Sequence, residues 1–361
     1  MLRVITHHAA KPMNRPTQRD IAKIANVSPV AVSLALRGHG RISKATRDRI
    51  VAIAKEIGYQ PDPLLSALTR YSRPAVPTDY QGTLAWINSY RQPEMLAQHY
   101  AYYLRGAQER CGELGFTLDE FRMVELGMNY RRLSNVLRAR NIQGVLFPPQ
   151  DSERRHITIA NFDWDRFSSV AFGFSLMRPK LDLVTNAQFR SARMAMRKLR
   201  SLGYRRIGFV ISHRSSERSD QNFLAGFLIE QQRLLASERV PVHFILGGSA
   251  AETQRRLREW RDVNAPDAIL AATWLEEWWG RLDIVTSAGN KRCGVALLDV
   301  PDGNTVETGV SQNNLIVGRT AVDILVAKVY ANQRGLPVAP LRTLVEGRWV
   351  AGTTAPRIVV R

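Results

Sequence analysis

Cysteine, acidic residues and long apolar runs are scarce in this sequence of 361 residues. The two cysteines, Cys111 and Cys293, lie far apart, in no CxxC pair and with no histidine at ligand spacing. This pattern excludes a disulfide framework and a structural zinc site, and it fits the reducing cytoplasm. No run approaches the ~18 apolar residues of a membrane helix, and the first residues lack the apolar core of a secretory signal. With 45% hydrophobic and 23% charged residues, we expect a globular cytoplasmic protein that does not cross a membrane.

Catalytic and metal-binding motifs are also lacking. His7 and His8 lie near the N-terminus outside any HExxH pattern, and no Walker-type phosphate loop occurs. The segment GGSAA, from Gly247 to Ala251, has part of a nucleophile-elbow pattern, but the last glycine of that pattern is missing. We therefore interpret Ser249 as the N-cap of a helix. The sequence predicts no enzyme, no metal site and no cofactor.

The positive charge is concentrated near the N-terminus. Lys and Arg number 51 against 32 Asp and Glu, which gives a formal charge of +19. Residues 15–73 hold 11 Lys and Arg and 4 Asp and Glu, about three times the charge density of the remainder. Such an excess indicates a polyanionic partner such as nucleic acid, and the alternative is an ordinary solvated surface. A structural motif has to decide between them.

Three short helices with clear start signals are predicted in this basic segment, after a flexible leader over residues 1–14. Thr17 can cap the first helix, with Asp20 three residues later in a capping-box position. Ser28 can cap the second helix, whose first position is taken by Pro29, where the missing N–H costs nothing. Ser43 can cap the third. Two short helices joined by about three residues and packed against a third form a helix-turn-helix arrangement. In DNA-binding proteins this arrangement positions one helix in the major groove.

The second helix has two faces of different character. Val32, Ala35 and Leu36 can pack on the neighbouring helices. Small polar and apolar groups on the opposite face could contact base edges and thymine methyls. A plain three-helix bundle is the alternative, although the outward face has no obvious core to fill. This outward set comprises Ser28, Pro29, Val30, Ser33, Leu34 and Arg37.

These residues resemble the lactose-repressor/galactose-repressor (LacI/GalR) family of bacterial transcription regulators. The resemblance rests on RDIA at Arg19–Ala22, VSPVAVSLAL at Val27–Leu36 and RISKATRDRIVAIAKEIGYQPDP at Arg41–Pro63. The second helix then corresponds to the DNA-reading helix, and we include Thr17 and Gln18 in the expected DNA-binding set. The sequence departs from the family at Pro29, Val30 and Leu34, where relatives often have polar side chains.

The resemblance also gives a role to LLSALTRY at Leu64–Tyr71, which follows two helix-breaking prolines. This stretch is too short to be a stable helix alone. In the family it is a hinge helix that orders on operator DNA, and Leu68 then matches the wedge that kinks the central base step in the minor groove. A simple linker helix is the alternative.

From about Tyr80 strands alternate with helices, which predicts a parallel sheet with helices on both faces. About nine strands are more than one sheet commonly holds, so we expect two lobes. We predict strands at 82–88, 117–123, 144–147, 168–172, 206–211, 242–246, 268–271, 295–299 and 341–346, and helices at 94–114, 130–140, 187–202, 220–236, 251–262 and 315–332.

This part resembles the family's effector domain, which has the two-lobed fold of periplasmic sugar-binding proteins. LRSLGYRRIGFV at Leu199–Val210, GVSQNNLIVGRTAVDIL at Gly309–Leu325 and VEGRWVAGTT at Val345–Thr354 carry the resemblance. A ligand should bind between the lobes, at the carboxyl ends of strands. Asp299 matches the family's ligand-binding acidic position, whereas Phe223 replaces its ligand-gripping arginine. The expected effector site comprises Asn88, Tyr90, Phe223, Trp274 and Asp299.

The sequence thus predicts a helix-turn-helix DNA-binding domain at 15–60, a hinge helix and linker at 61–79 and a two-lobed effector and dimerisation domain at 80–361. The expected function is that of a homodimeric repressor that binds double-stranded operator DNA under control of a small molecule, a sugar or sugar derivative. One alternative is a ligand-binding or protein-interaction module without operator binding. Another keeps DNA binding but replaces the small molecule by a partner protein.

Overall fold

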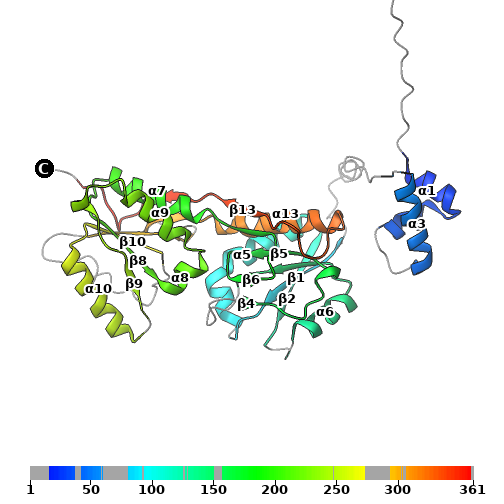
Figure 1. Ribbon diagram of the computed structural model, residues 1–361, viewed down its shortest axis with the longest axis horizontal. Coiled ribbons are helices and arrows are strands. Elements are labelled where there is room, and N and C mark those ends of the chain that lie inside the picture. The colour runs from blue at the N-terminus through cyan, green and yellow to red at the C-terminus, as the bar shows by residue number, and fades with distance from the viewer. Residues whose placement is uncertain are drawn as a thin grey trace, which may run out of the picture. The chain divides into compact units, whose positions relative to one another are not determined.

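The computed structural model divides the chain into two compact units, Met1–Val76 and Pro77–Arg361, which are described separately (Figure 1). The structure describes residues 16–36, 42–57, 59, 80–91, 93–124, 127, 129–149, 157–246, 248–272, 293–301, 303 and 306–358, and in 93–99 and 157 the backbone alone. The expected leader, at 1–14, and the expected hinge helix, at 64–71, lie outside these residues.

The first unit contains the three expected helices, α1 (Gln18–Ala25), α2 (Pro29–Leu36) and α3 (Lys44–Glu56). Between α1 and α2, Asn26 adopts the left-handed conformation (φ 48°, ψ 51°) that ends the first helix and turns the chain. Side chains from all three helices close a small apolar core. Its buried members are Ile21, Ala22, Ala25, Val32, Ala35, Ile50 and Ala54.

The second unit begins with a six-stranded sheet in which every pair of neighbouring strands is parallel. The helices α5 (Pro93–Glu113), α6 (Tyr130–Ala139) and α13 (Asn314–Tyr330) pack against it. A short parallel pair, β4 (Ile157–Thr158) and β6 (Leu176–Arg178), accompanies the sheet. The strand order is β13 (Arg342–Val345), β7 (Leu183–Asn186), β5 (Ser168–Phe172), β3 (Gly144–Phe147), β1 (Gly82–Asn88) and β2 (Phe116–Arg122).

Both faces of this sheet are covered, because successive side chains of a strand point to opposite faces. In β1, Leu84 and Trp86 belong to the core beneath α5 and α13. Ala85 and Ile87 belong to a second core beneath α6. This arrangement explains why the strand reads as an unbroken apolar run in the sequence.

The second sheet repeats the design, with α7 (Gln188–Ser201) and α9 (Asn222–Gln231) on one face and α10 (Ala250–Asn264) on the other (Figure 1). A short helix, α8 (His213–Arg218), follows the strand β8 (Ile207–Ser212) and connects it to α9. All neighbouring strands are parallel except β12 and β14. The strand order is β14 (Arg348–Val350), β12 (Thr308–Ser311), β11 (Gly294–Leu297), β10 (Ala268–Ala271), β8 (Ile207–Ser212) and β9 (His243–Ile245).

The two sheets define two lobes of the same topology, which confirms the predicted fold class. The chain passes between the lobes three times, from β7 to α7, from β12 to α13 and from β13 to β14. The expected helix at 220–236 was too long: α9 starts at Asn222, because Asp220 and Gln221 both have positive φ (50° and 58°) and cannot continue a helix. The sequence analysis did not predict the short strands β4, β6, β7, β12 and β14.

The helices α5 and α13 cross at two glycines. A Cβ atom added at Gly106 would collide with the backbone oxygen of Leu315, and one added at Gly318 would collide with the backbone oxygen of Tyr103. The two backbones therefore approach each other as closely as only glycine allows. Gly112, also in α5, has no atom within 4 Å of such a Cβ.

We predict that Gly106→Ala lowers the free energy of unfolding of the second unit by about 1–3 kcal/mol, because the crossing cannot widen without loss of packing. Gly112→Ala is the matched control and should leave this free energy unchanged or raise it by up to about 1 kcal/mol. All seven tryptophans lie in the second unit, so urea denaturation followed by tryptophan fluorescence reports on this unit alone. Equal stability of the two variants would contradict the close crossing.

Candidate nucleic-acid interface and effector site

The inner face of α2 determines the orientation of the whole helix. Val32 and Ala35 have exposed fractions of 0% and 2% and pack in the same core as Ile21 and Ile50. A helix of eight residues that buries these two positions must turn the opposite positions outward.

The outer face of α2 agrees with that expectation. Val30 is 67% exposed, Ser28 and Pro29 are exposed, and Ser33 and Leu34 are partly exposed. Ser28 acts as the expected cap, since its Oγ accepts a hydrogen bond from the N–H of Ala31 at 3.1 Å. The exposed residues thus surround the start of a capped helix, the end that docks on base edges in helix-turn-helix proteins.

The start of α1 is held by local hydrogen bonds. The carboxylate of Asp20 accepts from the N–H of Thr17 at 2.8 Å and from its hydroxyl at 2.6 Å. The Thr17 hydroxyl and then its N–H lower the pKa of Asp20, which keeps the carboxylate charged. Gln18 donates a hydrogen bond from Nε2 to the hydroxyl of Tyr59 at 3.1 Å, and this bond links α1 to the segment that follows α3. Arg37, the last expected base-contacting residue of α2, lies outside the described residues, as does Leu68.

The described part of the first unit carries more positive than negative charge. Six basic residues stand against the three acidic residues Asp20, Asp48 and Glu56. Arg49 extends across the helices and donates to the backbone oxygen of Ala25 at 2.8 Å. Exposed cations on the same unit as a reading helix could contact phosphates. The exposed basic residues of this unit are Arg19, Lys23, Lys44, Arg49 and Lys55, with Arg47 partly exposed.

In the second unit, a chain of hydrogen bonds starts at Asp299, at the carboxyl end of β11. Its Oδ1 accepts from Asn314 Nδ2 at 3.1 Å, and Asn314 Oδ1 accepts from Asn186 Nδ2 at 3.0 Å. Asn186 Oδ1 in turn accepts from the buried hydroxyl of Tyr103 at 2.7 Å. Four segments that are far apart in the sequence, two of them at passages between the lobes, therefore meet in one polar network.

The Tyr103 hydroxyl remains a hydrogen-bond donor in this network. Burial raises its pKa well above the usual range, and the negative charge of Asp299 raises it further. The first passage is also bonded to the second, because Asn186 Nδ2 donates to the backbone oxygen of Gln312 at 2.8 Å. Gln312 Oε1 accepts from the hydroxyl of Ser191, near the start of α7, at 3.2 Å.

Asn88 and Tyr90 lie at the carboxyl end of β1, as expected, and both are buried. Asn88 Oδ1 accepts from the N–H of Tyr90 at 3.1 Å, and Asn88 Nδ2 donates to Glu120 Oε1 at 2.8 Å. The side chain of Asn88 thus fixes the turn that leads to Tyr90. Its role in ligand binding stays a prediction.

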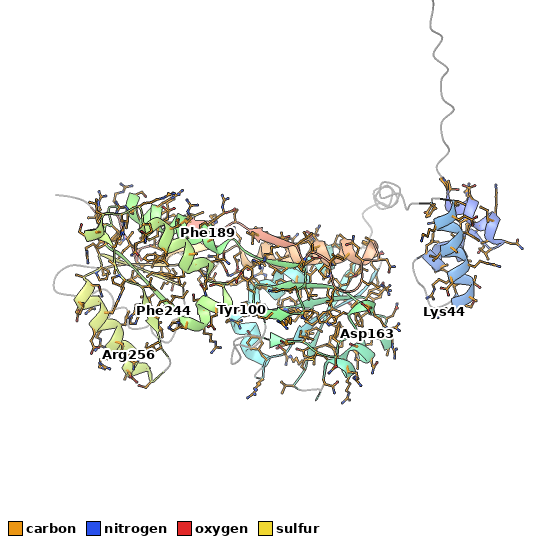
Figure 2. The ribbon with its side chains drawn as sticks, in the orientation of Figure 1. Lys44, Tyr100, Asp163, Phe189, Phe244 and Arg256 are labelled. Carbon is orange, nitrogen blue, oxygen red and sulfur yellow. The ribbon has the colours of Figure 1, made fainter. Side chains whose placement is uncertain are left out.

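A residue that the sequence analysis missed, Arg218, connects the two lobes. It ends α8 and donates from a terminal guanidinium nitrogen to the hydroxyl of Tyr100 at 3.2 Å. Burial alone would lower the pKa of Arg218, but its contacts with the phenol oxygens of Tyr100 and Tyr90 raise the pKa. Figure 2 shows Tyr100 on the side of the first lobe that faces the second. Tyr100 also has non-helical backbone angles inside α5 (φ −131°, ψ 28°).

Phe223 lies five residues after Arg218 and packs partly buried against the core of the second lobe. An arginine therefore does occur in this segment, one helix earlier than the family pattern places it. No sequence motif marks it, because α8 is a short helix that the sequence pattern did not predict. Trp274 lies outside the described residues.

A second contact joins the lobes two residues beyond Arg218. Asp220 accepts from a terminal nitrogen of Arg342 at 3.2 Å, and the Arg342 guanidinium lies over the ring of Phe174, 5.2 Å from its centroid. Both charged side chains are more than half exposed, so the ion pair contributes little to stability.

The described residues contain no group of three or more His, Cys, Asp or Glu that could hold a metal ion. Within the same part of the chain, no helix has the length and apolarity needed to cross a membrane.

Comparison with known proteins gives one family match. Residues 17–62 match the model of the bacterial regulatory proteins of the lacI family. The matched segment contains α1, α2 and α3 and thus the proposed interface.

Curated relatives extend the similarity along the chain. DegA, a helix-turn-helix transcriptional regulator of Bacillus subtilis (strain 168), is 24% identical over 300 residues, which are 80% of this chain and 79% of DegA. The repressor PurR of Escherichia coli O139:H28 is 24% identical over 241 residues, 64% of each chain, so the match spans less than two thirds of PurR. The sucrose operon repressor of Klebsiella pneumoniae is 48% identical over 50 residues, 13% of this chain and 15% of that repressor.

Solved structures share the fold. The complex of the transcriptional regulator CelR with cellobiose has a TM-score of 0.54 at 20% identity and covers 94% of this chain and 100% of CelR. The lac repressor dimer bound to operator and the anti-inducer ONPF also has a TM-score of 0.54, at 16% identity, and covers 95% of this chain and 100% of the repressor chain.

The capped, outward-facing helix thus lies in a segment that matches bacterial regulatory proteins, and the two-lobed α/β unit shares its fold with solved transcription regulators. The first unit is similar to the DNA-binding segment of the lacI family, and the similarity to the regulator DegA extends over 80% of the chain.

Proposed function

We propose that this protein is a sequence-specific transcription repressor that binds operator DNA as a homodimer and responds to a small molecule. The observation that carries the proposal is the exposed outer face of α2, held outward by the burial of Val32 and Ala35 within the segment that matches the family model. We propose no catalytic activity and a cytoplasmic location, where the operator is accessible.

On DNA, two copies of α2 would occupy adjacent major-groove half-sites of a near-palindrome. Contacts from exposed Lys and Arg to phosphates would supply much of the affinity and make it steeply dependent on salt. We assign the DNA-binding domain to residues 15–60 and the hinge and linker to 61–79. Leu68 of each copy would enter the minor groove at the centre of the site.

The effector would bind between the lobes, near Asp299 and the Tyr100–Arg218 contact. The carboxylate of Asp299 can accept hydrogen bonds from hydroxyl groups, and tyrosine rings suit the faces of a sugar, so we propose a sugar or sugar derivative. A bound effector would rotate the lobes about the three passages and change the spacing of the two hinges. The coupling between effector and DNA would amount to about 1–3 kcal/mol.

We predict that Val30→Glu weakens operator binding about 100-fold, because a carboxylate on the reading face meets the negative potential of the groove. Val51→Glu, on α3, is the matched control: Val51 is 47% exposed, and its substitution adds the same charge to the same unit. Val51→Glu should cost only a few-fold. Binding is measured by band shift on genomic fragments that the purified full-length protein selects.

Equal affinities of the Val30→Glu and Val51→Glu variants would contradict the assignment of α2 as the reading helix. Failure of the wild-type protein to enrich any fragment would contradict operator binding as a whole. That second result favours a ligand-binding or protein-interaction module.

We predict that a sugar of the correct class stabilises the second unit by about 2.7 kcal/mol at 100 times its dissociation constant, seen as a thermal shift. Asp299→Asn should remove this shift because the charged acceptor is lost. Asp262→Asn, an exposed carboxylate on α10 of the same lobe, is the control and should retain the shift. A shift that persists in Asp299→Asn would exclude Asp299 from the site. A screen without any shift would favour a partner protein as co-regulator.

A further inference from the structure

The exposed start of α2 presents side chains that cannot form hydrogen bonds. Pro29 and Val30 are exposed and Leu34 is partly exposed, and all three are purely hydrocarbon. The neighbouring Ser28 already uses its Oγ as an acceptor for the helix cap. Ser33 and Arg37 of the expected outward set can form hydrogen bonds, so the restriction on base edges applies to the positions that Pro29, Val30 and Leu34 face.

The four base pairs differ in the groups that they present in the major groove. Guanine, adenine and cytosine are usually recognised through hydrogen bonds from Arg, Lys, Asn, Gln or acidic side chains. A hydrocarbon side chain against those edges removes water from polar groups and returns no hydrogen bond, which is unfavourable. Thymine alone carries a methyl group in this groove, and contact with that methyl buries apolar surface on both sides.

We propose that this protein recognises its half-sites through the methyl groups of thymines, with Val30 as the principal contact and Pro29 and Leu34 beside it. The inference rests on the proposed operator binding and names the chemistry of its specificity. Thymines are therefore the bases at which the half-site tolerates the least change.

The geometry of α2 suits such a contact. Pro29 has a fixed φ, and a β-branched valine in a helix is restricted to one main rotamer. The N-cap at Ser28 and the buried Val32 and Ala35 hold the helix backbone in place. The methyl groups of Val30 are thus pre-positioned, and little side-chain freedom is lost when DNA binds.

The test starts from a random pool of duplexes selected with the purified full-length protein. In the best-bound duplex, each thymine of a half-site is replaced singly by deoxyuridine, which pairs in the same way but lacks the methyl group. We expect at least one position at which this replacement weakens binding about fourfold, the effect of burying one methyl group.

Three variants assign that effect to a side chain. In Val30→Ala, the thymine and deoxyuridine duplexes should bind with nearly equal affinity at the sensitive position, because the thymine methyl has lost its partner side chain. Leu34→Ala tests a neighbouring position in the same way. Val51→Ala, which truncates an exposed valine on α3, is the matched control and should keep the full penalty. Because Val30 and Val51 are both exposed, thermal unfolding should be unchanged in both variants.

A penalty that disappears with Val30→Ala or Leu34→Ala and persists with Val51→Ala supports the inference. A selected duplex that binds equally well with deoxyuridine at every position overturns it and leaves operator binding intact. A penalty that is the same in wild type, Val30→Ala and Leu34→Ala also overturns it, because the methyl effect then arises elsewhere. Absence of any selected duplex overturns the proposed function itself, so the two failures are distinguishable.

Discussion

The burial of one face of a single eight-residue helix is the constraint on which the nucleic-acid interface depends. Val32 and Ala35 are needed to close a core that has few other members, so α2 cannot rotate without loss of that core. The packing of the buried face of α2 therefore determines which residues of the helix are exposed on its outer face. Val30 is exposed because the core excludes it, and this exposure makes an apolar side chain available for contact with DNA.

In the second unit, polar side chains at the passages between the lobes are positioned by hydrogen bonds to one another. Asp299, Asn314, Asn186 and Tyr103 form one hydrogen-bonded chain, and partly satisfied networks of this kind are unfavourable when buried. The lobe rotation that we propose would have to keep these hydrogen bonds or replace them by hydrogen bonds to a ligand. The exposed contact between Arg342 and Asp220 is the less stable of the observed links and can break without such a penalty.

Local signals in the sequence predicted local structure well. The caps at Ser28 and Ser43 involve residues within a few positions of one another, so their geometry follows from spacing alone. The alternation of strands and helices predicted two lobes, and the structure has them. The start of the predicted helix at 220–236 was wrong because the backbone angles at Asp220 and Gln221, which no composition rule encodes, prevent a helix there.

The proposed effector site was only partly predictable. Asn88 came from its place at the end of a predicted strand and Asp299 from the family resemblance, whereas Tyr103, Asn186, Asn314 and Arg218 did not stand out. Their partners lie far away in sequence: Tyr103 is 83 residues from Asn186, and Arg218 is 118 residues from Tyr100. Only the packing of helices and strand ends in the folded unit brings them together, and a single sequence carries no local signal of that proximity.

The most direct test of the central claim is the accessibility of methyl groups in valine- and leucine-labelled protein, followed by NMR with a soluble paramagnetic agent. In the free protein, the signals of Val30 and Val51 should broaden strongly, while those of Val32 should not. After addition of a selected operator duplex, the account predicts that Val30 becomes protected while Val51 stays accessible. Val30 signals that remain as accessible as those of Val51 in the complex would contradict it.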